Sequence, residues 1–554
     1  MDEQLREQVS DLLAEPIADA DPAFFKKAKR LYRGCVRTGR LNDLGLEPAT
    51  KILTGLGGWP LAEEDRWDES KFDWKELSYK MMDMGMYSLG LFTVIVGVDI
   101  SNTTRHTLAL SPPHFNLALK SIGEMAGVPR LAQYRSVIQG AAELLRPGDR
   151  LNGTRLATQA SQTALFELEL ESSTQSLEDQ QNLTLAKHMS VGELQARYPY
   201  VPWLEYFRRL LPESVGITAG ETVLVADHRY FESLGPLLQS TPKRTLANYM
   251  VWRGLEDLVF PHLDDDFRDL MIGADLERAS LKGRWEHCVK LVQRTMRSAT
   301  SAMYARRHSS EEARRTARAM VQDIRKELHQ VLEAATWMDP DTKRAAMLKA
   351  ESMRYNVAFP DELLNDTALD ELFSGGSLFN EDGLMANWWD AQTRDLFHEK
   401  VGCIVDQYSS IADEETNVTV NGVLTQSENI ADNAGLKLAY RAYRRYTARR
   451  GEEPRVVLHV PSRPGVPAAP GPVQELGAVK RLALSPRQMF WLSFASVWCS
   501  KETVMMRDRT LRTSTHLPGT YRVNGALRNQ EAFAQDFNCP AGAPMNPSSR
   551  CHIW

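Results

Sequence analysis

Residues 428 to 443 read ENIADNAGLKLAYRAY and lie in a longer stretch whose apolar residues recur at helical spacing. We predict a helix here from Ser427 to Arg450. Its expected packing positions are Ile430, Ala431, Leu438, Ala439 and Ala442. Glu428 and Asp432 then lie four residues apart on one face, where two carboxylates repel each other by about a few tenths of a kcal/mol. By spacing alone, the pair is typical of a solvated helix surface.

Helical spacing also dominates from residue 1 to about residue 350. The strongest segment runs from Ser309 to Trp337, where Ser309 and Glu312 resemble a capping box. Its apolar stripe comprises Ala317, Met320, Val321, Ile324, Leu328, Val331, Leu332 and Ala335. Asp339-Pro340 is expected to end this helix and to start the next one, which runs to about Met353. The sequence therefore predicts a mainly α protein.

A proline-rich stretch interrupts this pattern after the helix that ends at Arg450. Six prolines fall between Pro454 and Pro472, a composition that disfavours both a helix and a central strand. We interpret residues 454–481 as an exposed insertion. The chain shows no internal repeat of 20 to 50 residues, which excludes a solenoid or a propeller.

Composition excludes several classes of protein. The chain has 554 residues, of which 43% are hydrophobic, enough for two or more sizeable cores. Lys and Arg number 66 against 72 Asp and Glu, and the net charge of −6 gives no electrostatic reason to expect a nucleic-acid partner. Six cysteines are too few for a disulfide-dense small scaffold, and none are spaced as C-x-x-C.

The features that report on compartment disagree with one another. Residues Met1 to Arg6 lack the basic start and apolar core of a secretory signal. The longest uncharged stretch, Met84 to Val98, is shorter than the roughly 20 residues of a membrane span, so we expect a buried strand or helix there. In contrast, the number of Asn-x-Ser/Thr glycosylation sequons exceeds the number expected by chance and favours a secretory history. These sequons lie at Asn102, Asn152, Asn182, Asn365 and Asn417.

The common catalytic motifs are absent from the sequence. No two of the 12 histidines are four residues apart, so the chain has no H-E-x-x-H zinc motif. His398-Glu399 imitates its start, but the second imidazole is missing, and we expect a surface helix face there. A phosphate-binding loop, a G-x-G-x-x-G turn and a G-x-S-x-G elbow are missing as well.

The 428–443 stretch and four further ordered blocks nevertheless resemble one family. The 428–443 stretch closely resembles the signature helix of the neprilysin and endothelin-converting-enzyme family of zinc metalloendopeptidases. Further blocks look similar and occur in the same order: Asn380–Gly383 with Trp388-Trp389, Phe494–Cys499, His516–Arg522, and the Cys551-His552-Ile553-Trp554 terminus. The helical N-terminal half is similar to the second lobe of that family. Four ordered blocks are far more specific than any one of them.

The resemblance implies a fold, an activity and a site. The fold would be two mainly helical lobes, with a helical domain at 1–373 and a truncated, thermolysin-like catalytic lobe at 374–554. The activity would be cleavage of short peptides outside the cell or at the plasma membrane. Glu428 would be the third zinc ligand, and Asp432 would orient a ligand histidine. His516 and Arg522 would stabilise the oxyanion and position the substrate.

The sequence departs from the family pattern between Leu372 and Phe379. It passes over the place where the family carries its substrate-binding Asn-Ala segment and its H-E-x-x-H helix. Both ligand histidines and the general-base Glu are therefore absent, and one carboxylate does not hold zinc usefully at neutral pH. We predict that this chain binds no zinc and does not hydrolyse peptides.

The cysteines follow the same resemblance. It implies disulfides between Cys35 and Cys288 and between Cys403 and Cys551. Cys499 and Cys539 are left over, because their family partners lie in an N-terminal segment that is not in this sequence. Free or mispaired thiols are expected at both positions.

Three interpretations of the chain stay open at this point. It is an incomplete form of a peptidase, a pseudopeptidase that binds peptides or a partner without cleaving them, or a non-functional product whose catalytic lobe stays molten. A faulty gene model or alternative splicing would explain the gap equally well. Sequencing the transcript across Phe373 and across 454–481 separates these origins.

Overall fold

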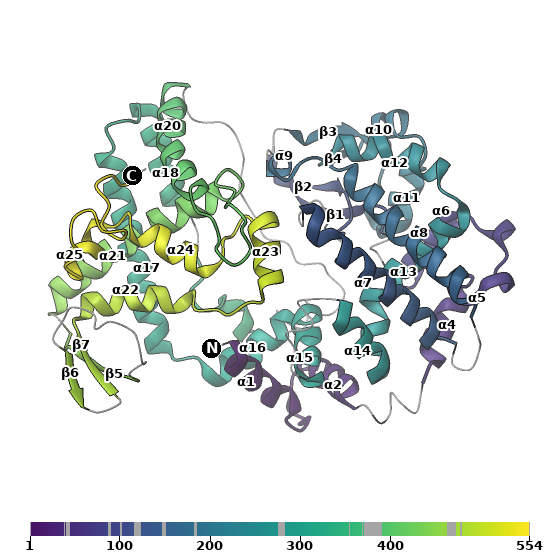
Figure 1. Cartoon of the computed structure of the whole chain (residues 1–554), viewed down its shortest axis with the longest axis horizontal. Coiled ribbons are helices and arrows are strands. Elements are labelled where there is room, and N and C mark those ends of the chain that lie inside the picture. Colours follow the sequence, from purple (N-terminus) through teal and green to yellow (C-terminus); the bar gives the residue numbers. More distant parts are fainter. Residues whose placement is uncertain are drawn as a thin grey trace. The chain divides into compact units, whose positions relative to one another are not determined.

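The computed structural model describes residues 2–37, 39, 45–86, 90–99, 102–115, 123–146, 151–181, 185–274, 283–353, 355–367, 369, 391–451, 453–461, 473–476 and 479–552. Most of these residues are helical, which confirms the mainly α prediction (Figure 1). Contacts divide the chain into an N-terminal unit, Met1–Ser309 with Phe359–Ala386, and a C-terminal unit, Ser310–Ala358 with Asn387–Trp554. Residues 310–358, expected in the first domain, thus group with the second. The predicted boundary at 373/374 itself lies outside the described residues.

The N-terminal unit consists of helices and one four-stranded sheet. Its helices are α1 (Asp2–Ala14), α2 (Ala23–Val36), α4 (Glu47–Leu56), α5 (Pro60–Glu63), α6 (Trp74–Asp83), α7 (Gly123–Leu144), α8 (Gly153–Ser172), α9 (Leu177–Gln181), α10 (Val191–Arg197), α11 (Trp203–Leu210), α12 (His228–Ser240), α13 (Lys243–Leu258), α14 (Asp265–Ala274), α15 (Arg284–Thr295) and α16 (Arg297–His308). The core includes the fully buried side chains of Trp59, Trp203 and Trp252. These large rings remove much apolar surface from water.

The sheet of this unit has the strand order β1-β2-β4-β3. Its strands are β1 (Thr93–Asp99), β2 (Asn102–Ser111), β3 (Lys187–Ser190) and β4 (Thr222–Val225). Strand β2 runs antiparallel to β1 and parallel to β4, and β3 is antiparallel to β4. The uncharged stretch from Met84 to Val98 supplies most of β1, which confirms the strand alternative. The expected burial is not confirmed, because most residues of β1 are half-buried and Ile95 is 54% exposed. No described helix is both long and apolar enough to cross a membrane.

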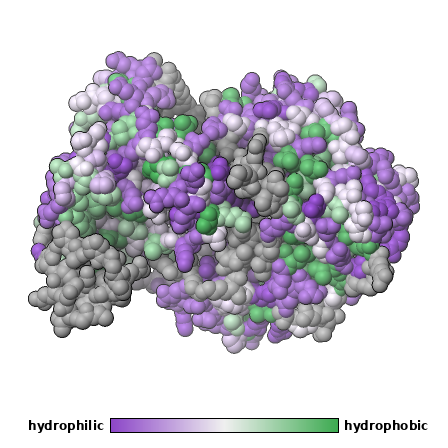
Figure 2. Space-filling model, in the orientation of Figure 1, coloured by the Kyte–Doolittle hydropathy of each residue, from purple (hydrophilic) through white to green (hydrophobic). Residues whose placement is uncertain are grey.

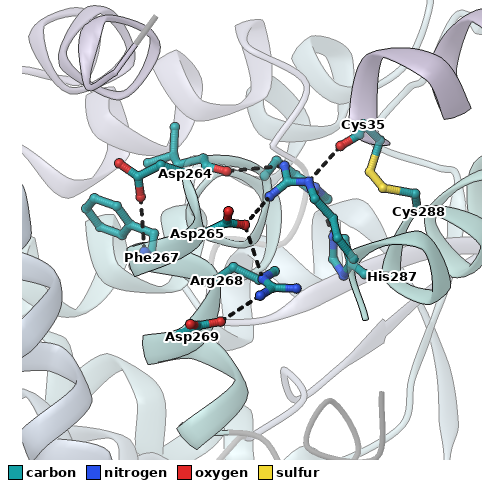
Figure 3. A network of polar contacts seen from close by, with 11 residues as sticks. Cys35, Asp264, Asp265, Phe267, Arg268, Asp269, His287 and Cys288 are labelled. Atoms are coloured by element: carbon teal, nitrogen blue, oxygen red, sulfur yellow. Dashed lines mark hydrogen bonds and ion pairs between the residues drawn. A yellow bond between two sulfur atoms is a disulfide. The ribbon is translucent and has the colours of Figure 1, made fainter. Parts of the chain in front are cut away.

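A disulfide joins α2 to α15 in the N-terminal unit. Cys35 and Cys288 are bonded, as the family resemblance implies. Beside them, the largely buried Arg284 donates from Nε to the Cys35 carbonyl oxygen at 2.7 Å and lies 3.3 Å from Asp265. Figure 3 shows the acidic start of α14 next to this disulfide, with Arg268 between the carboxylates. The network fixes helices that lie far apart in the sequence.

The C-terminal unit also consists mainly of helices. They are α17 (Glu311–Ala334), α18 (Pro340–Ser352), α20 (Ala391–Ser409), α21 (Gln426–Arg450), α22 (Pro486–Val497), α23 (Val504–Thr513), α24 (Gly519–Leu527) and α25 (Glu531–Asp536). Cys403 of α20 is bonded to Cys551, again as the resemblance implies. Tyr440 of α21 stacks on Trp491 of α22 with ring centroids 4.2 Å apart. Cys499 and Cys539 are free.

Local signals predicted the starts of α18 and α21 to within one residue, but misplaced the cap of α17 and its end, which is Ala334 rather than Trp337. Asp339 accepts hydrogen bonds from two N–H groups at the start of α18, as expected. The cap of α17 is Ser310, however, and not Ser309. Two adjacent serines offer the same chemistry, and Ser309 instead follows the last turn of α16. Ala313 occupies the N3 position of this cap and has no side chain that could return a hydrogen bond, so Ser310 caps α17 without the expected capping box.

Two predicted packing positions are wrong, whereas the other predicted positions on both helices are buried or half-buried. Met320 of α17 is 46% exposed, and Ala431 of α21 is exposed. Buried positions on these helices include Glu327, which pairs with Arg445, and Asn433. Polar residues that find partners inside the unit thus take places that apolar periodicity assigns to hydrophobic residues.

The proline-rich insertion contributes to a small sheet that the sequence did not predict. Strands β5 (Val456–Pro461), β6 (Val473–Leu476) and β7 (Val479–Leu484) have the order β5-β7-β6. Proline is tolerated at the end of an edge strand such as β5, where no ladder hydrogen bond is lost. Val457 is 50% exposed, so this element lies at the surface as predicted. Residues 462–472 are not among those described.

The exposure of several surface residues can be compared with the sequence predictions. His398 and Glu399 of α20 are exposed, which confirms the surface helix face. Figure 2 shows a described surface rich in hydrophilic residues, with separate hydrophobic patches. The sequon residues Asn152, Asn365 and Asn417 are exposed, whereas Asn182 and the side chain of Asn102 lie outside the described part. The block Asn380–Gly383 with Trp388-Trp389, and the Leu372–Phe379 junction, lie outside it too.

Candidate active site

The four site residues predicted from the resemblance lie together in the C-terminal unit. Glu428 occupies the first turn of α21, and Asp432 follows one turn later. Arg522 lies in α24, and His516 is in the segment before that helix. Helices α21 and α24 pack against each other, which brings residues about ninety positions apart into contact.

Arg522 and Asp432 form the strongest contact of the site. Arg522 Nε donates to Asp432 Oδ2 at 2.6 Å, and a terminal nitrogen donates to Oδ1 at 2.8 Å. The two side chains are only 8% and 10% exposed. The guanidinium also lies 3.9 Å from the ring centroid of Trp498. A two-pronged, charge-assisted pair stacked on an aromatic ring fixes both side chains.

Glu428 is paired less tightly and nearer the solvent. Its Oε2 atom lies 3.0 Å from His516 Nε2 and 3.6 Å from a terminal nitrogen of Arg522. The side chains of His516 and Glu428 are 56% and 32% exposed. Water and salt screen an exposed pair of this kind, so it adds little to stability.

Buried amides set the register between α21 and its neighbours. Asn433 Nδ2 donates to the hydroxyl oxygen of Tyr408 at 3.3 Å, and Asn529 donates to Asn433 Oδ1 at 2.8 Å. A Cβ at Gly525 would lie 2.4 Å from the Tyr408 hydroxyl, so only glycine fits there. Burial raises the pKa of Tyr408, which stays a neutral donor and acceptor. The sequence prediction missed this network; its signal was the pair of asparagines Asn429 and Asn433 inside a helix.

A second buried acid lies beside the site. Asp413 Oδ2 accepts a hydrogen bond from the Tyr521 hydroxyl at 2.6 Å and lies 3.4 Å from Arg507. Burial raises the pKa of Asp413, but the hydrogen bonds from Tyr521 and Thr416 and the charge of Arg507 outweigh it, so the pKa is lowered below 3.8. Asp413 thus holds Tyr521, the neighbour of Arg522, in place.

The lowered pKa of Asp413 predicts acid sensitivity. The unfolded chain binds this proton more readily than the folded chain, so the stabilisation is complete above pH 3.8 and is lost as the pH falls through the folded pKa. Asp413→Asn should lower the free energy of unfolding at neutral pH and should reduce its fall under acid conditions. Denaturant titrations of both proteins at several pH values measure this. Identical pH dependence in the two proteins would contradict the assignment.

The side chains around Glu428 do not supply the ligands that a catalytic zinc ion needs. Such an ion takes three protein ligands, commonly histidines with a carboxylate. In the part of the chain that the structure describes, no three His, Cys, Asp or Glu side chains are grouped as metal ligands. The neighbours of Glu428 are one imidazole and the guanidinium of Arg522, which is a cation without an acceptor. Asp432, which would orient a ligand histidine, is bound to Arg522 instead.

Two family models together match nearly the whole chain. Residues 1–360 match the N-terminal profile of Peptidase family M13, and residues 371–459 and 474–553 match the second profile of that family. The chain belongs to peptidase family M13. The second M13 profile leaves out 460–473, which agrees with an insertion inside the predicted 454–481 stretch.

Curated M13 relatives align over the full length of the chain. Neprilysin-2 of Drosophila melanogaster is 27% identical over 100% of this chain and 82% of its own length. Human neprilysin is 25% identical, over 100% and 85%. The first alignment spans 667 positions, 113 more than the 554 residues here, so the relative carries at least that many residues without a counterpart. This agrees with a missing internal block.

Solved M13 structures share the fold. The Mycobacterium tuberculosis zinc metalloprotease Zmp1, in complex with an inhibitor, aligns with a TM-score of 0.76 and 18% identity, over 100% of this chain and 92% of its own. PepO from Lactobacillus rhamnosis gives 0.75 and 18%, over 99% and 93%. At this identity the likeness shows the fold alone.

Replacing His516 should have only a small effect on the stability of this M13 chain, because its pairing with Glu428 is weak. His516→Ala should change the free energy of unfolding by less than about 1 kcal/mol, because the contact with Glu428 is exposed and screened. Thermal and denaturant unfolding measure the change. A loss of more than about 2 kcal/mol would mean that His516 has buried partners in solution.

Proposed function

We propose that this chain is an M13 family member that does not hydrolyse peptides. The observation that carries the proposal is the donor set around Glu428, where a carboxylate faces one imidazole and one guanidinium. Nowhere in the 554 residues do two histidines lie four apart, so the sequence offers no H-E-x-x-H helix to complete the set. Asp432 and Arg522 then serve to hold α21 and α24 together, to which the exposed contact between Glu428 and His516 adds little.

A hydrolysis assay tests this proposal. The full chain is incubated with a quenched fluorescent short peptide in the presence of added zinc, next to a Glu428→Gln variant. We expect the same rate of peptide hydrolysis with both proteins, and no higher a rate than in buffer alone. A rate that is higher in the wild type, is lost in Glu428→Gln and is blocked by a chelator would overturn the proposal.

Peptide binding without cleavage is a second candidate function. Both units have their own buried cores, and the family fold is retained over the full chain. This favours a folded pseudopeptidase over a molten product. Calorimetric titration with short peptides should then give an affinity that chelators leave unchanged. Absence of affinity for a broad peptide library would count against this candidate.

We also infer an oxidising, extracellular or cell-surface location. Two disulfides that close loops of 253 and 148 residues are typical of such compartments. Exposed sequons at Asn152, Asn365 and Asn417 are compatible with glycans. Expression in a secreting eukaryotic cell should yield protein whose mass falls on treatment with an N-glycosidase. An unchanged mass would argue against glycosylation.

A further inference from the structure

The second half of α21 carries a cluster of arginines at the surface of the C-terminal unit. Between Asn433 and Gly451 the sequence contains six cations and no acidic residue. The two acidic site residues, Glu428 and Asp432, lie in the first turns of the same helix. Five of the six cations are exposed: Arg441, Arg444, Arg445, Arg449 and Arg450. The site described above gives none of these five a role.

Helical spacing places four of the arginines on one face. Residues three and four positions apart are neighbours on a helix, so Arg441 lies beside Arg444 and Arg445. Arg449 continues the row one turn after Arg445. These four side chains, called the arginine face below, extend over about 12 Å of the helix axis at 1.5 Å per residue. The result is a row of guanidinium groups and not a single point of charge.

The opposite side of the helix is apolar and packs inside the unit. Tyr440 stacks on Trp491 of α22 with ring centroids 4.2 Å apart, and Tyr443 stacks on Phe490 at 5.4 Å. No large hydrophobic side chain of α21 is exposed in the part of this helix that the structure describes. A helix that binds at a membrane interface needs an exposed apolar face. The arginine face therefore does not fit insertion into a lipid surface.

Two carboxylates of α17 neutralise only part of this charge. Helices α17 and α21 pack against each other, Glu327 pairs with Arg445, and Asp323 pairs with Arg449 (Figure 1). The two acidic side chains are largely buried, whereas about half of each arginine side chain is exposed. A guanidinium group has five N–H donors, so each arginine keeps donors for a ligand. The acids thus fix the arginines without covering them.

The remaining arginines leave an excess of positive charge. Arg441 and Arg444 form no ion pair within the described residues of the chain. Arg450 stacks on Tyr446 at 5.2 Å, at the end of the helix. Burial and the charge of Arg441 lower the pKa of Lys437, one turn earlier. The surface therefore attracts anions, and it keeps its charge at any physiological pH because arginine does not lose its proton.

The shape of the cluster selects the class of anion. A single phosphate binds where several donors converge on one point, whereas an exposed row of guanidinium groups matches anionic groups that repeat along a chain. Runs of Lys and Arg are typical of surfaces that bind nucleic acids or heparin. The chain as a whole has a net charge of −6, unlike the basic domains that bind nucleic acids. The extracellular or cell-surface location inferred above also favours a polysaccharide.

We propose that the arginine face of α21 binds sulfated polysaccharides of the heparin class, whose sulfate oxygens accept hydrogen bonds from the guanidinium groups. The proposal concerns a surface outside the site residues, and its test measures binding and not hydrolysis. Its failure would therefore leave the proposed loss of peptidase activity untouched.

Binding of the full chain to immobilised heparin tests the proposal. We expect saturable binding whose logarithmic affinity falls linearly with the logarithm of the salt concentration. Heparin from which the sulfate groups have been removed should not bind. Lack of saturable binding at about 50 mM salt would overturn the proposal. Tighter binding to duplex DNA or to vesicles that contain phosphatidylserine than to heparin would overturn it as well, because the partner would then belong to another class.

Matched variants locate the binding surface. Arg441→Ser with Arg444→Ser should weaken heparin binding at least about tenfold and reduce the salt slope by about one per arginine. The melting temperature should not change, since neither residue has an ion pair in the described part of the chain. Arg344→Ser with Lys501→Ser removes the same charge from exposed positions on other segments of this unit and should bind like wild type. Equal affinities of the two double variants would refute the assignment.

Discussion

Arg522→Ala is expected to destabilise the C-terminal unit by about 3 to 5 kcal/mol, the largest single-residue effect that we predict. The substitution leaves Asp432 as a buried charge without its two hydrogen bonds, which measure 2.6 and 2.8 Å. It also removes the cation that stacks on Trp498. Denaturant unfolding followed by tryptophan fluorescence measures the loss, since Trp491 and Trp498 lie in the same unit.

Two further variants identify the cause of that loss. Arg522→Lys keeps the charge but not the two-pronged geometry and should lie between wild type and Arg522→Ala. The double variant Arg522→Met with Asp432→Leu removes both charges and should recover much of the stability. An Arg522→Ala protein within about 1 kcal/mol of wild type would show that the pair is solvated and that our description of the site is wrong.

Loss of the Cys403–Cys551 disulfide should be about as damaging. The bond closes a loop of 148 residues, for which chain entropy gives a stabilisation of about 5 kcal/mol. A Cys403→Ser, Cys551→Ser protein should unfold at clearly lower denaturant concentration than wild type under non-reducing conditions. Cys499→Ser is the matched control, because Cys499 is free and exposed. Equal midpoints for the disulfide variant and this control would contradict the prediction.

Helices were predictable where the signal is local. Asp339-Pro340 carries both a cap and a first-turn proline, and α18 begins at Pro340 as expected. Packing faces were less predictable, because they depend on partners from elsewhere in the chain. Glu327 is buried on α17 only because Arg445 of α21 reaches it. Strand β5 was missed because the prolines around it outweighed its valines, although an edge strand tolerates such neighbours.

The site was also predictable only in part, because it depends on contacts between residues that lie far apart in the sequence. Spacing placed Glu428 and Asp432 on one helix face, but no local pattern links them to Arg522, which lies ninety positions further on. The family resemblance supplied that residue, as a group that stabilises the oxyanion and positions the substrate. In the structure, Asp432 contacts Arg522, whereas the resemblance implies that it orients a ligand histidine. The amide network of Asn433 and Tyr408 needed three-dimensional contacts to be recognised.

Zinc content of the purified full chain tests the central claim most directly. The protein is equilibrated with zinc at neutral pH, passed through a desalting column and analysed for metal, with Glu428→Gln treated in parallel. We predict well below about 0.1 zinc per chain for both proteins, since one carboxylate and one exposed imidazole do not retain the ion. About one zinc per chain in the wild type, lost in Glu428→Gln, would contradict the account.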